Sequence, residues 1–217
     1  KNSKTLKNRS ENSINGILQL NSKLPMQKNG EKYITTITPI IVGKFNPQNN
    51  KNISNEDRMI DYTNIYSIDR ISSSSVIEGG ESLTLGNEFK LFDKKDPSEE
   101  LFSINLASSF RAKENFDLPK NSFLGQKTSN LIGQTNLKLN NFVDLKYDFL
   151  TDNNLEDFKY HKLNSKFTVN NFISTFEFTE ENDEIGTTHF ISNETSLKIS
   201  DNKNLLFRTR KNKKTDL

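Results

Sequence analysis

The chain of 217 residues contains no cysteine and no tryptophan, and only 32% of its residues are hydrophobic. Without cysteine, these residues can form neither a disulfide nor a thiolate metal site. No apolar run approaches the roughly 18 residues that a membrane helix needs, which excludes a helical membrane span. Residues 1–10 are polar and lack the apolar stretch of a secretory signal peptide.

The chain also has little excess charge, with 30 Lys+Arg against 28 Asp+Glu and a net charge of +2. Its basic residues are scattered except at the C-terminal end, so nothing electrostatic indicates a nucleic-acid partner. The low apolar fraction fits either a disordered chain or a large barrel with a polar lumen. The 16 phenylalanines argue against disorder, because disordered chains are poor in aromatic residues.

Residues 76–92, VIEGGESLTLGNEFKLF, alternate between apolar and polar side chains with the period of a strand. One face carries Ile77, Leu83, Leu85, Phe89 and Leu91, and the other carries Glu78, Ser82, Thr84, Glu88 and Lys90. The run is far longer than the ~5–6 residues of a usual strand. A long strand that is apolar on one side and charged on the other suits a wall between lipid and water, and so predicts a transmembrane β-barrel.

The rest of the chain predicts about ten strands in all and no convincing helix between them. The expected strands are residues 14–24, 32–45, 76–92, 101–112, 130–140, 142–151, 157–169, 171–179, 188–200 and 204–213. Residues 65–71 are expected as either a short strand or an ordered part of a loop. Pro39 predicts a bulge or a local break within residues 32–45. The pairs Asn140–Asn141 and Asn170–Asn171 predict tight turns, because asparagine tolerates positive φ.

Short and long connections alternate along the chain. The shorter ones are residues 25–31, 93–100, 140–141, 170–171 and 200–204, and the longer ones are 46–75, 113–129, 151–157 and 180–187. Outer-membrane barrels have short periplasmic turns and longer extracellular loops, so this alternation is typical of them. We therefore predict an all-β, antiparallel, transmembrane outer-membrane β-barrel. Since the chain begins without methionine and ends abruptly, we interpret residues 1–217 as an incomplete part of one barrel domain.

Residues 36–92 carry motifs of a known family. A proline-containing strand, TITPIIVGKFNP, is followed by a D-x-x-N-I-Y-S-x-x-R segment and then by an E-G-G strand with a further glycine. The matching positions are Asp61, Asn64, Tyr66, Arg70, Glu78, Gly79, Gly80 and Gly86. In these motifs the chain resembles the LPS-assembly outer-membrane protein family LptD, also called organic solvent tolerance protein, in its alphaproteobacterial form.

The resemblance implies a function: delivery of lipopolysaccharide (LPS) to the outer leaflet of the outer membrane of a Gram-negative bacterium, without enzymatic activity. It implies a periplasmic jelly roll outside these residues and a large barrel. LPS sugars would pass through the barrel lumen, and the acyl chains would leave by a lateral opening between the first and last strands. The implied partners are LPS, an LptE-type lipoprotein plug, an LptA-type periplasmic bridge through the missing N-terminal domain, and outer-membrane lipid.

The candidate residues fall into three groups. Gly79, Gly80 and Gly86 have two interpretations. One is a bend of the barrel wall or the close approach of another backbone, such as the plug. The other is a simple bulge, which is the more routine use of a strand glycine. Asp61, Asn64, Tyr66 and Arg70 are expected to have a structural role in a loop folded over or into the barrel. The expected lumen-facing residues are Glu78, Glu88, Lys90, Asn105, Arg111, Asn136, Lys138, Asp144 and Lys146. They would either solvate the lumen or contact LPS sugars, LPS phosphates or the plug.

His161 and His189 are the two histidines of the chain, and they lie on separate predicted strands. No H-x-H or H-E-x-x-H spacing is present, so we predict no metal site, cofactor or catalytic residue. Two alternatives remain open from the residues alone. One is a porin or another passive outer-membrane barrel. The other is a soluble or surface-displayed β-sandwich for adhesion, whose apolar faces would pack against a second sheet.

Overall fold

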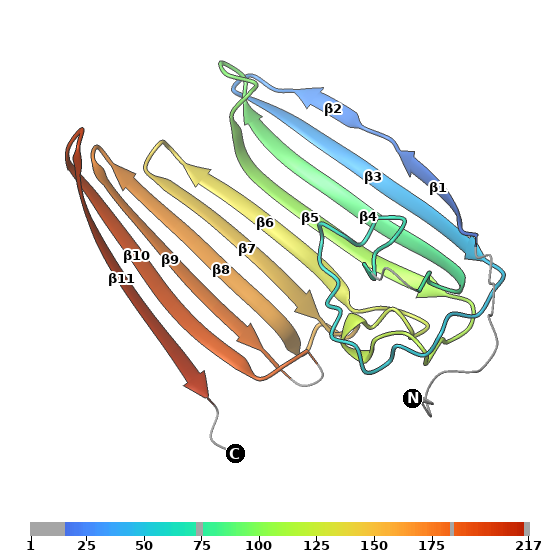
Figure 1. The fold of residues 1–217 in the computed structure, drawn as a ribbon. Helices are drawn as coiled ribbons and strands as arrows, with labels where there is room; N and C mark the ends of the chain where they lie inside the picture. The colour runs from blue at the N-terminus through green and yellow to red at the C-terminus, as the bar shows by residue number, and fades with distance from the viewer. Residues whose placement is uncertain (1–15, 73–75, 183–184, 215–217) are drawn as a thin grey trace.

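The computed structural model describes residues 16–72, 76–182 and 185–214, and these form an antiparallel sheet of 11 strands (Figure 1). The strands are β1 (Leu18–Lys23), β2 (Met26–Asn29), β3 (Tyr33–Asn46), β4 (Gly80–Asp93), β5 (Glu100–Arg111), β6 (Leu131–Leu139), β7 (Val143–Thr151), β8 (Phe158–Val169), β9 (Phe172–Glu181), β10 (Thr188–Ser200) and β11 (Lys203–Lys214). From β3 onward, each pairs with the next in the chain. Because β1 and β11 lie at opposite edges, the sheet stays open and forms an incomplete barrel.

Helix is almost absent from the described part of the chain. Its one named helix is a short 3₁₀ turn, η1 (Lys120–Ser122). Among the described residues, no helix is long and apolar enough to cross a membrane. The predicted strands from residue 101 onward agree with the structure to within two residues. Two boundaries needed correction here: the turn at 25–31 contains β2, and the first strand begins at Leu18. Residues 14 and 15 of that predicted strand lie outside the described residues. Residues 65–71 form turns, which agrees with the ordered loop and not with the short strand.

Pro39 does not break its own strand, as the sequence had suggested, but the neighbouring one. β3 pairs with β4 without a register shift at Pro39. On the other side, β1 and β2 pair with β3 in one continuous register but are separated at Leu24 and Pro25. The amide of Leu24 donates to the carbonyl of Pro39 over 3.1 Å. Since N–H and C=O of one residue point to the same side of an antiparallel strand, the donor that Pro39 lacks is missing toward β1 and β2.

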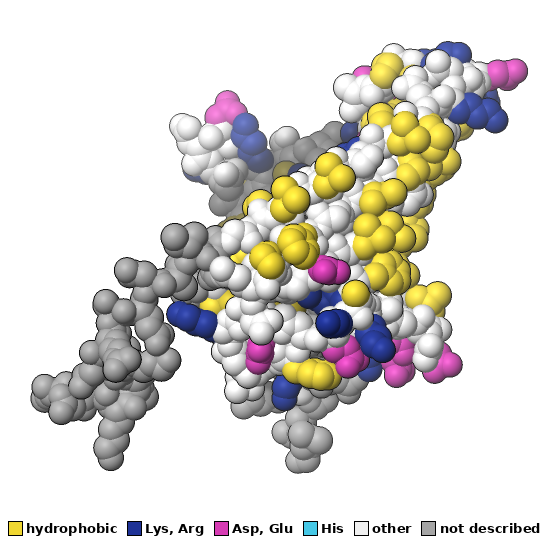
Figure 2. Space-filling view, turned by 90° about the vertical axis from the view of Figure 1, so that its right-hand side faces the viewer, with side chains coloured by type: hydrophobic (Ala, Val, Ile, Leu, Met, Phe, Trp, Pro, Cys, Tyr) yellow, Lys and Arg dark blue, Asp and Glu magenta, His cyan; other side chains and the backbone are white. Residues whose placement is uncertain are grey.

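The two faces of the sheet differ in what covers them. One, which we call the bare face, presents partly exposed hydrophobic side chains, among them Ile41, Phe45, Leu83 and Leu85. Figure 2 shows hydrophobic side chains in a stripe along the molecule, with charged side chains near both ends. The opposite face, the loop-bearing face, is covered in part by the chain's own long loops. A sheet that is apolar on its uncovered side is expected of a wall that meets lipid there.

Short turns and long loops lie at opposite ends of the strands, as the alternation predicted (Figure 1). At the short end, Asn140 and Asn170 adopt φ of 55° and 51°, which confirms both asparagine turns. At the long end, residues 47–79 connect β3 to β4 and residues 112–130 connect β5 to β6. The remaining connections at that end are residues 152–157 and 182–187, of which 183 and 184 are outside the described residues.

Candidate functional site

The two longest loops fold back onto the loop-bearing face and bury a small apolar core against it. Ile65 and Ile71 of loop 47–79 are 0% and 1% exposed, and Leu118 and Leu124 of loop 112–130 are 2% and 1% exposed. They belong to one cluster of buried hydrophobic residues to which the sheet contributes Ala107, Ile132 and Leu150. The loops are therefore packed parts of the wall rather than free surface connections.

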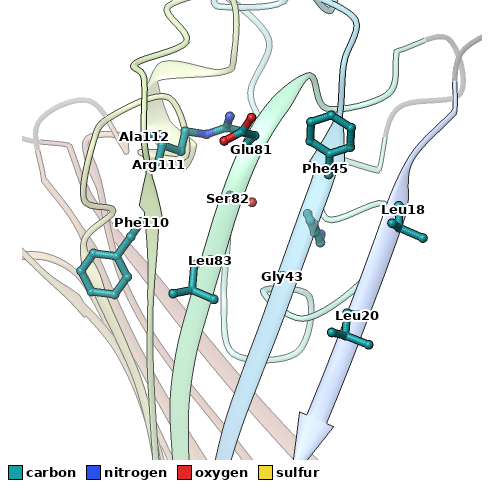
Figure 3. A pocket seen from close by; sticks show the side chains of 11 residues that line it. Leu18, Leu20, Gly43, Phe45, Glu81, Ser82, Leu83, Phe110, Arg111 and Ala112 are labelled. Carbon is teal, nitrogen blue, oxygen red and sulfur yellow. The ribbon is translucent and has the colours of Figure 1, made fainter.

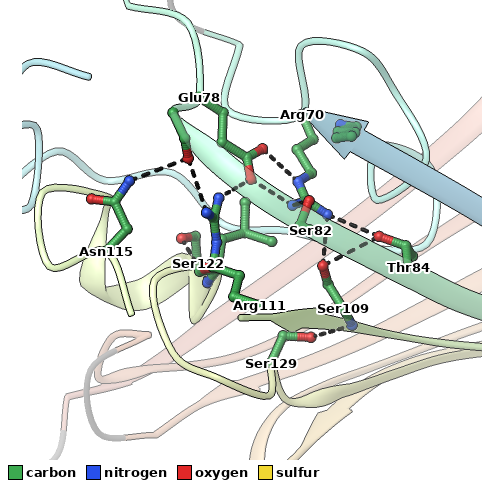
Figure 4. A network of polar contacts seen from close by, with 12 residues as sticks. Arg70, Glu78, Ser82, Thr84, Ser109, Arg111, Asn115, Ser122 and Ser129 are labelled. Atoms are coloured by element: carbon green, nitrogen blue, oxygen red, sulfur yellow. Dashed lines mark hydrogen bonds and ion pairs between the residues drawn. The ribbon is translucent and has the colours of Figure 1, made fainter. Parts of the chain in front are cut away.

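Arg70 fastens loop 47–79 to the strands beneath it (Figure 4). It is 1% exposed, and each of its five N–H donors has an acceptor. Its Nε and Nη2 donate to the two carboxylate oxygens of Glu78 over 2.7 and 2.5 Å. The other bonds go to the hydroxyls of Ser82 at 2.8 Å and of Thr84 and Ser109, both at 3.0 Å. Arg70 therefore joins loop 47–79 to both β4 and β5.

Arg111, at the end of β5, approaches Glu78 from the other side (Figure 4). Its Nη2 donates to Glu78 Oε1, and its Nη1 donates to the carbonyl of Gly79 over 2.9 Å. Its Nε donates to the carbonyl of Leu124 over 2.5 Å, which ties in loop 112–130. Glu78 thus accepts from two buried guanidinium groups and holds both long loops to the wall.

The charges of this cluster are unequal. Lys44, which is 5% exposed, donates from Nζ to the carbonyls of Ser67 and Ile68 in loop 47–79. Two buried arginines therefore pair with one buried carboxylate, and the amine of Lys44 is buried in the same cluster. Burial alone would raise the pKa of Glu78, but the positive charge and hydrogen bonds of Arg70, followed by the charges of Arg111 and Lys44, outweigh it and lower that pKa to about 2. Glu78 is consequently ionised at neutral pH.

Acid should loosen loop 47–79 as Glu78 becomes protonated. Because its pKa in the folded protein, about 2, is below the ordinary value of 4.5, its stabilisation is complete above about pH 4.5 and is lost as pH falls toward 2. The whole effect is on the order of 3 kcal/mol, and more than half is gone at pH 3. Hydrogen exchange of residues 65–71 in the full-length protein, corrected for intrinsic rates, should show lower protection at pH 3 than at pH 7. Equal protection at both pH values would contradict this assignment.

The predicted motif residues upstream of Arg70 shape the loop itself. The carboxylate of Asp61 accepts from the amides of Thr63 at 2.7 Å and Asn64 at 3.1 Å. The side-chain oxygen of Asn64 accepts in return from the amide of Asp61 at 3.0 Å. These reciprocal bonds fix a tight turn. Tyr66 follows this turn, and its ring points at Gly86 of the sheet.

The motif glycines permit close approach, and at Gly86 the simple bulge that the sequence favoured is wrong. The register of β4 with both neighbours is unbroken at Gly86. A Cβ on Gly86 would stand 1.7 Å from the hydroxyl oxygen of Tyr66, and one on Gly79 would stand 2.5 Å from the carbonyl of Gln48. Gly80 has φ of +86°, which favours glycine. The approaching groups are therefore the chain's own loop.

That geometry also corrects the start of the strand predicted at residue 76. β4 begins at Gly80, so Val76 to Gly79 belong to the loop. Glu78 is accordingly not a strand residue facing open water but a loop residue that is 4% exposed.

The other expected lumen-facing residues all lie on the loop-bearing face, in two different environments. Asn105 and Arg111 are 5% and 6% exposed beneath the loops, so for them simple solvation is wrong. Glu88 accepts from the hydroxyl of Tyr62 over 3.0 Å at the loop margin. Beyond the loops, cross-strand register places Lys90 and the residues of β6 and β7 on the same face.

Four of the expected residues gather where the loops leave the face uncovered. Asn136, Lys138, Asp144 and Lys146 line one hollow of about 340 Å³ on β6 and β7, near the short turns. Charges there are paired across the wall: Lys138 Nζ lies 2.8 Å from a Glu99 carboxylate oxygen. Most of the residues that line this hollow are charged or polar, so it can hydrogen-bond a hydrophilic ligand.

The two histidines lie on either side of Glu180, an arrangement that the sequence did not reveal. Register places His161, Glu180 and His189 in one row across β8, β9 and β10 on the bare face. The Nε2 atom of His161 lies 2.8 Å and Nδ1 of His189 lies 3.3 Å from the Glu180 carboxylate. Among the described residues, no group of three or more His, Cys, Asp or Glu has an arrangement that could hold a metal ion.

In a comparison with protein families, the chain matches a family described as "LptD: LPS transport system D" over residues 1–202. Comparison with curated proteins found no match. The family match covers the open sheet as far as the β10–β11 turn and both long loops, and it does not favour a passive porin.

Proposed function

The chain belongs to the LptD family, whose role is LPS transport and assembly at the outer membrane, and on that premise we propose that it forms part of the wall of the C-terminal barrel domain. In this arrangement the loop-bearing face lines the lumen and the bare face meets lipid. The unpaired edges of β1 and β11 are consistent with further strands on both sides, because an open edge leaves backbone groups without partners. The chain moves LPS and has no catalytic role.

The observation that carries this proposal is the division of the loop-bearing face. Its β3–β5 part is filled by loops 47–79 and 112–130, held by Arg70, Glu78 and Arg111. Its β6–β7 part is open, charged and polar. The hydroxyls and phosphates of LPS sugars would be solvated by such a surface, whereas acyl chains would not. We therefore assign the sugar path to the open part.

The partners follow from the same arrangement. An LptE-type lipoprotein would fill the lumen that this wall leaves open, and an LptA-type bridge would deliver LPS from the periplasm through the protein's N-terminal domain. The short-turn end would face the periplasm and the long loops the cell exterior, as in outer-membrane barrels generally.

Photo-crosslinking in cells tests the sugar path. A photoreactive residue at Lys146 of the full-length protein should form an adduct with LPS while LPS is being supplied, because Lys146 lines the open hollow. Val143, at the short-turn end of the same strand, is the matched control, since its side chain points to the bare face and it is not among the residues that line the hollow. No LPS adduct at Lys146, or equal adducts at both positions, would contradict the path. Unchanged surface LPS after depletion of the protein would contradict the function itself.

A further inference from the structure

One strand glycine is not explained by the chain's own packing. An added Cβ would meet Tyr66 at Gly86 and the ring of Phe149 at Gly133, at 1.7 and 2.0 Å. At Gly43, near the long-loop end of β3, such a Cβ would meet nothing within 4 Å. The register of β3 with β1 and β4 is continuous there, so Gly43 does not mark a bulge. A strand glycine without either role often marks the place where a ligand approaches the sheet.

Gly43 forms the floor of a groove on the bare face (Figure 3). In the row across the strands it lies between Leu20 of β1 and Leu83 of β4, and Phe110 of β5 follows Leu83. Phe45 stands over it toward the long-loop end. The groove has a volume of about 540 Å³. Its walls are large hydrophobic side chains that are 38–75% exposed, and so they are open to an apolar ligand.

The groove becomes polar at the long-loop end of the strands. Glu81, which pairs with Phe45 across β3 and β4, lies at that end. A second hollow of about 520 Å³ shares Phe45, Glu81, Arg111 and Ala112 with the first, and its further charged and amide lining includes Asn49, Lys113, Glu114 and Asp117. An apolar channel that ends among carboxylate, ammonium and amide groups fits a lipid with a hydroxyl-bearing, charged head group.

From this geometry we infer that the groove binds an LPS molecule of the outer leaflet, with one acyl chain over Gly43 and its sugar head group against the Glu81–Lys113 end. The inference rests on the proposed function, because that function supplies LPS and turns the long loops toward the cell exterior. With the long loops at the cell exterior, the apolar walls of the groove lie at the depth of the acyl chains of the outer leaflet. The polar end of the groove lies at the depth of the head groups. The site is separate from the sugar path, which lies on the opposite face.

Filling the groove tests this site. Gly43→Leu should fold normally, since nothing lies within 4 Å of an added Cβ, the rest of the side chain enters the open groove, and the φ of Gly43 is not positive. Thr135→Leu is the control, because Thr135 is also on the bare face, in the row of Ile104 and Tyr147 away from the groove. The full-length protein with its partners is exchanged into detergent, and retained LPS and phospholipid are counted by native mass spectrometry. Surface LPS is measured in the same cells.

We expect occupancy of this LPS to fall roughly tenfold in Gly43→Leu, because the new side chain fills the space over Gly43 and removes the van der Waals contacts of the acyl chain with the groove floor. Thr135→Leu should retain LPS as the wild type does, and all three proteins should deliver LPS to the surface. Equal LPS retention by Gly43→Leu and wild type would overturn the site. Retention of phospholipid in place of LPS, lost on Gly43→Leu, would overturn the choice of ligand. Neither result would affect the proposed function, which fails only if surface LPS does not depend on the protein.

Discussion

Replacing Glu78 with Gln should detach loop 47–79 from the sheet and cost about 3–5 kcal/mol of stability, because two buried guanidinium groups lose their common counter-charge. Arg70 and Arg111 would remain buried beside each other with a neutral amide between them. The measurement is denaturant unfolding of the full-length protein in detergent, together with protease sensitivity of loop 47–79.

Glu194→Gln is the matched control for that substitution. Glu194 also pairs with an arginine, Arg208, but their side chains are 49% and 67% exposed. Exposed pairs contribute ~0–1 kcal/mol, so this variant should unfold nearly as the wild type does. If the two variants lost stability equally, the buried network would not be what holds the loop.

Replacing Gly86 with Ala should force Tyr66 out of its position and destabilise the protein by about 1–3 kcal/mol, the usual cost of overpacking. The added Cβ would stand 1.7 Å from the Tyr66 hydroxyl oxygen and 2.8 Å from Cζ of its ring, and 3.0 Å from the carbonyl of Leu106. Truncating Tyr66 should relieve most of this clash. The double variant Gly86→Ala, Tyr66→Ala should therefore lose less stability than the sum of the two single variants.

Gly43→Ala provides the comparison within the same sheet. Because an added Cβ there meets nothing, alanine should be neutral or slightly stabilising through the entropy of the unfolded chain.

The double variant gives the result that would contradict this packing. If the stability losses of Gly86→Ala and Tyr66→Ala were additive, Tyr66 would not rest on Gly86.

The strands, turns and faces could be read from the sequence because each depends on neighbouring residues. Alternation with period two predicted the faces of Leu83, Ser82 and Lys146. The tolerance of asparagine for positive φ predicted both turns, and the φ angles confirm them. Pro39 was misjudged because the pattern does not show to which neighbouring strand its missing N–H would point. Once the pairing is known, that direction explains the break between β1 and β2.

The interior of the candidate site could not be predicted because it depends on loops without periodicity. Arg70 and Glu78 both lie in loop 47–79, but Arg111 lies at the end of β5 and reaches Glu78 only when that loop is folded against the sheet. The motif gave one signal of this site: a charged residue, Glu78, stands directly before two consecutive glycines in a segment that was predicted to be part of the wall. In the same way, His161 and His189 meet at Glu180 only through the register of three strands.

The measurement that tests the central claim most directly is water accessibility on the two faces of one strand. Lys146 and Leu145 are neighbours on β7, and their side chains point to opposite faces. Each is replaced by cysteine, Lys146→Cys or Leu145→Cys, in the full-length protein in its membrane, and treated with a charged maleimide. A water-filled lumen on the loop-bearing face predicts rapid labelling of Lys146→Cys and protection of Leu145→Cys by lipid. Equal labelling, or the reverse order, would contradict the assignment of the two faces.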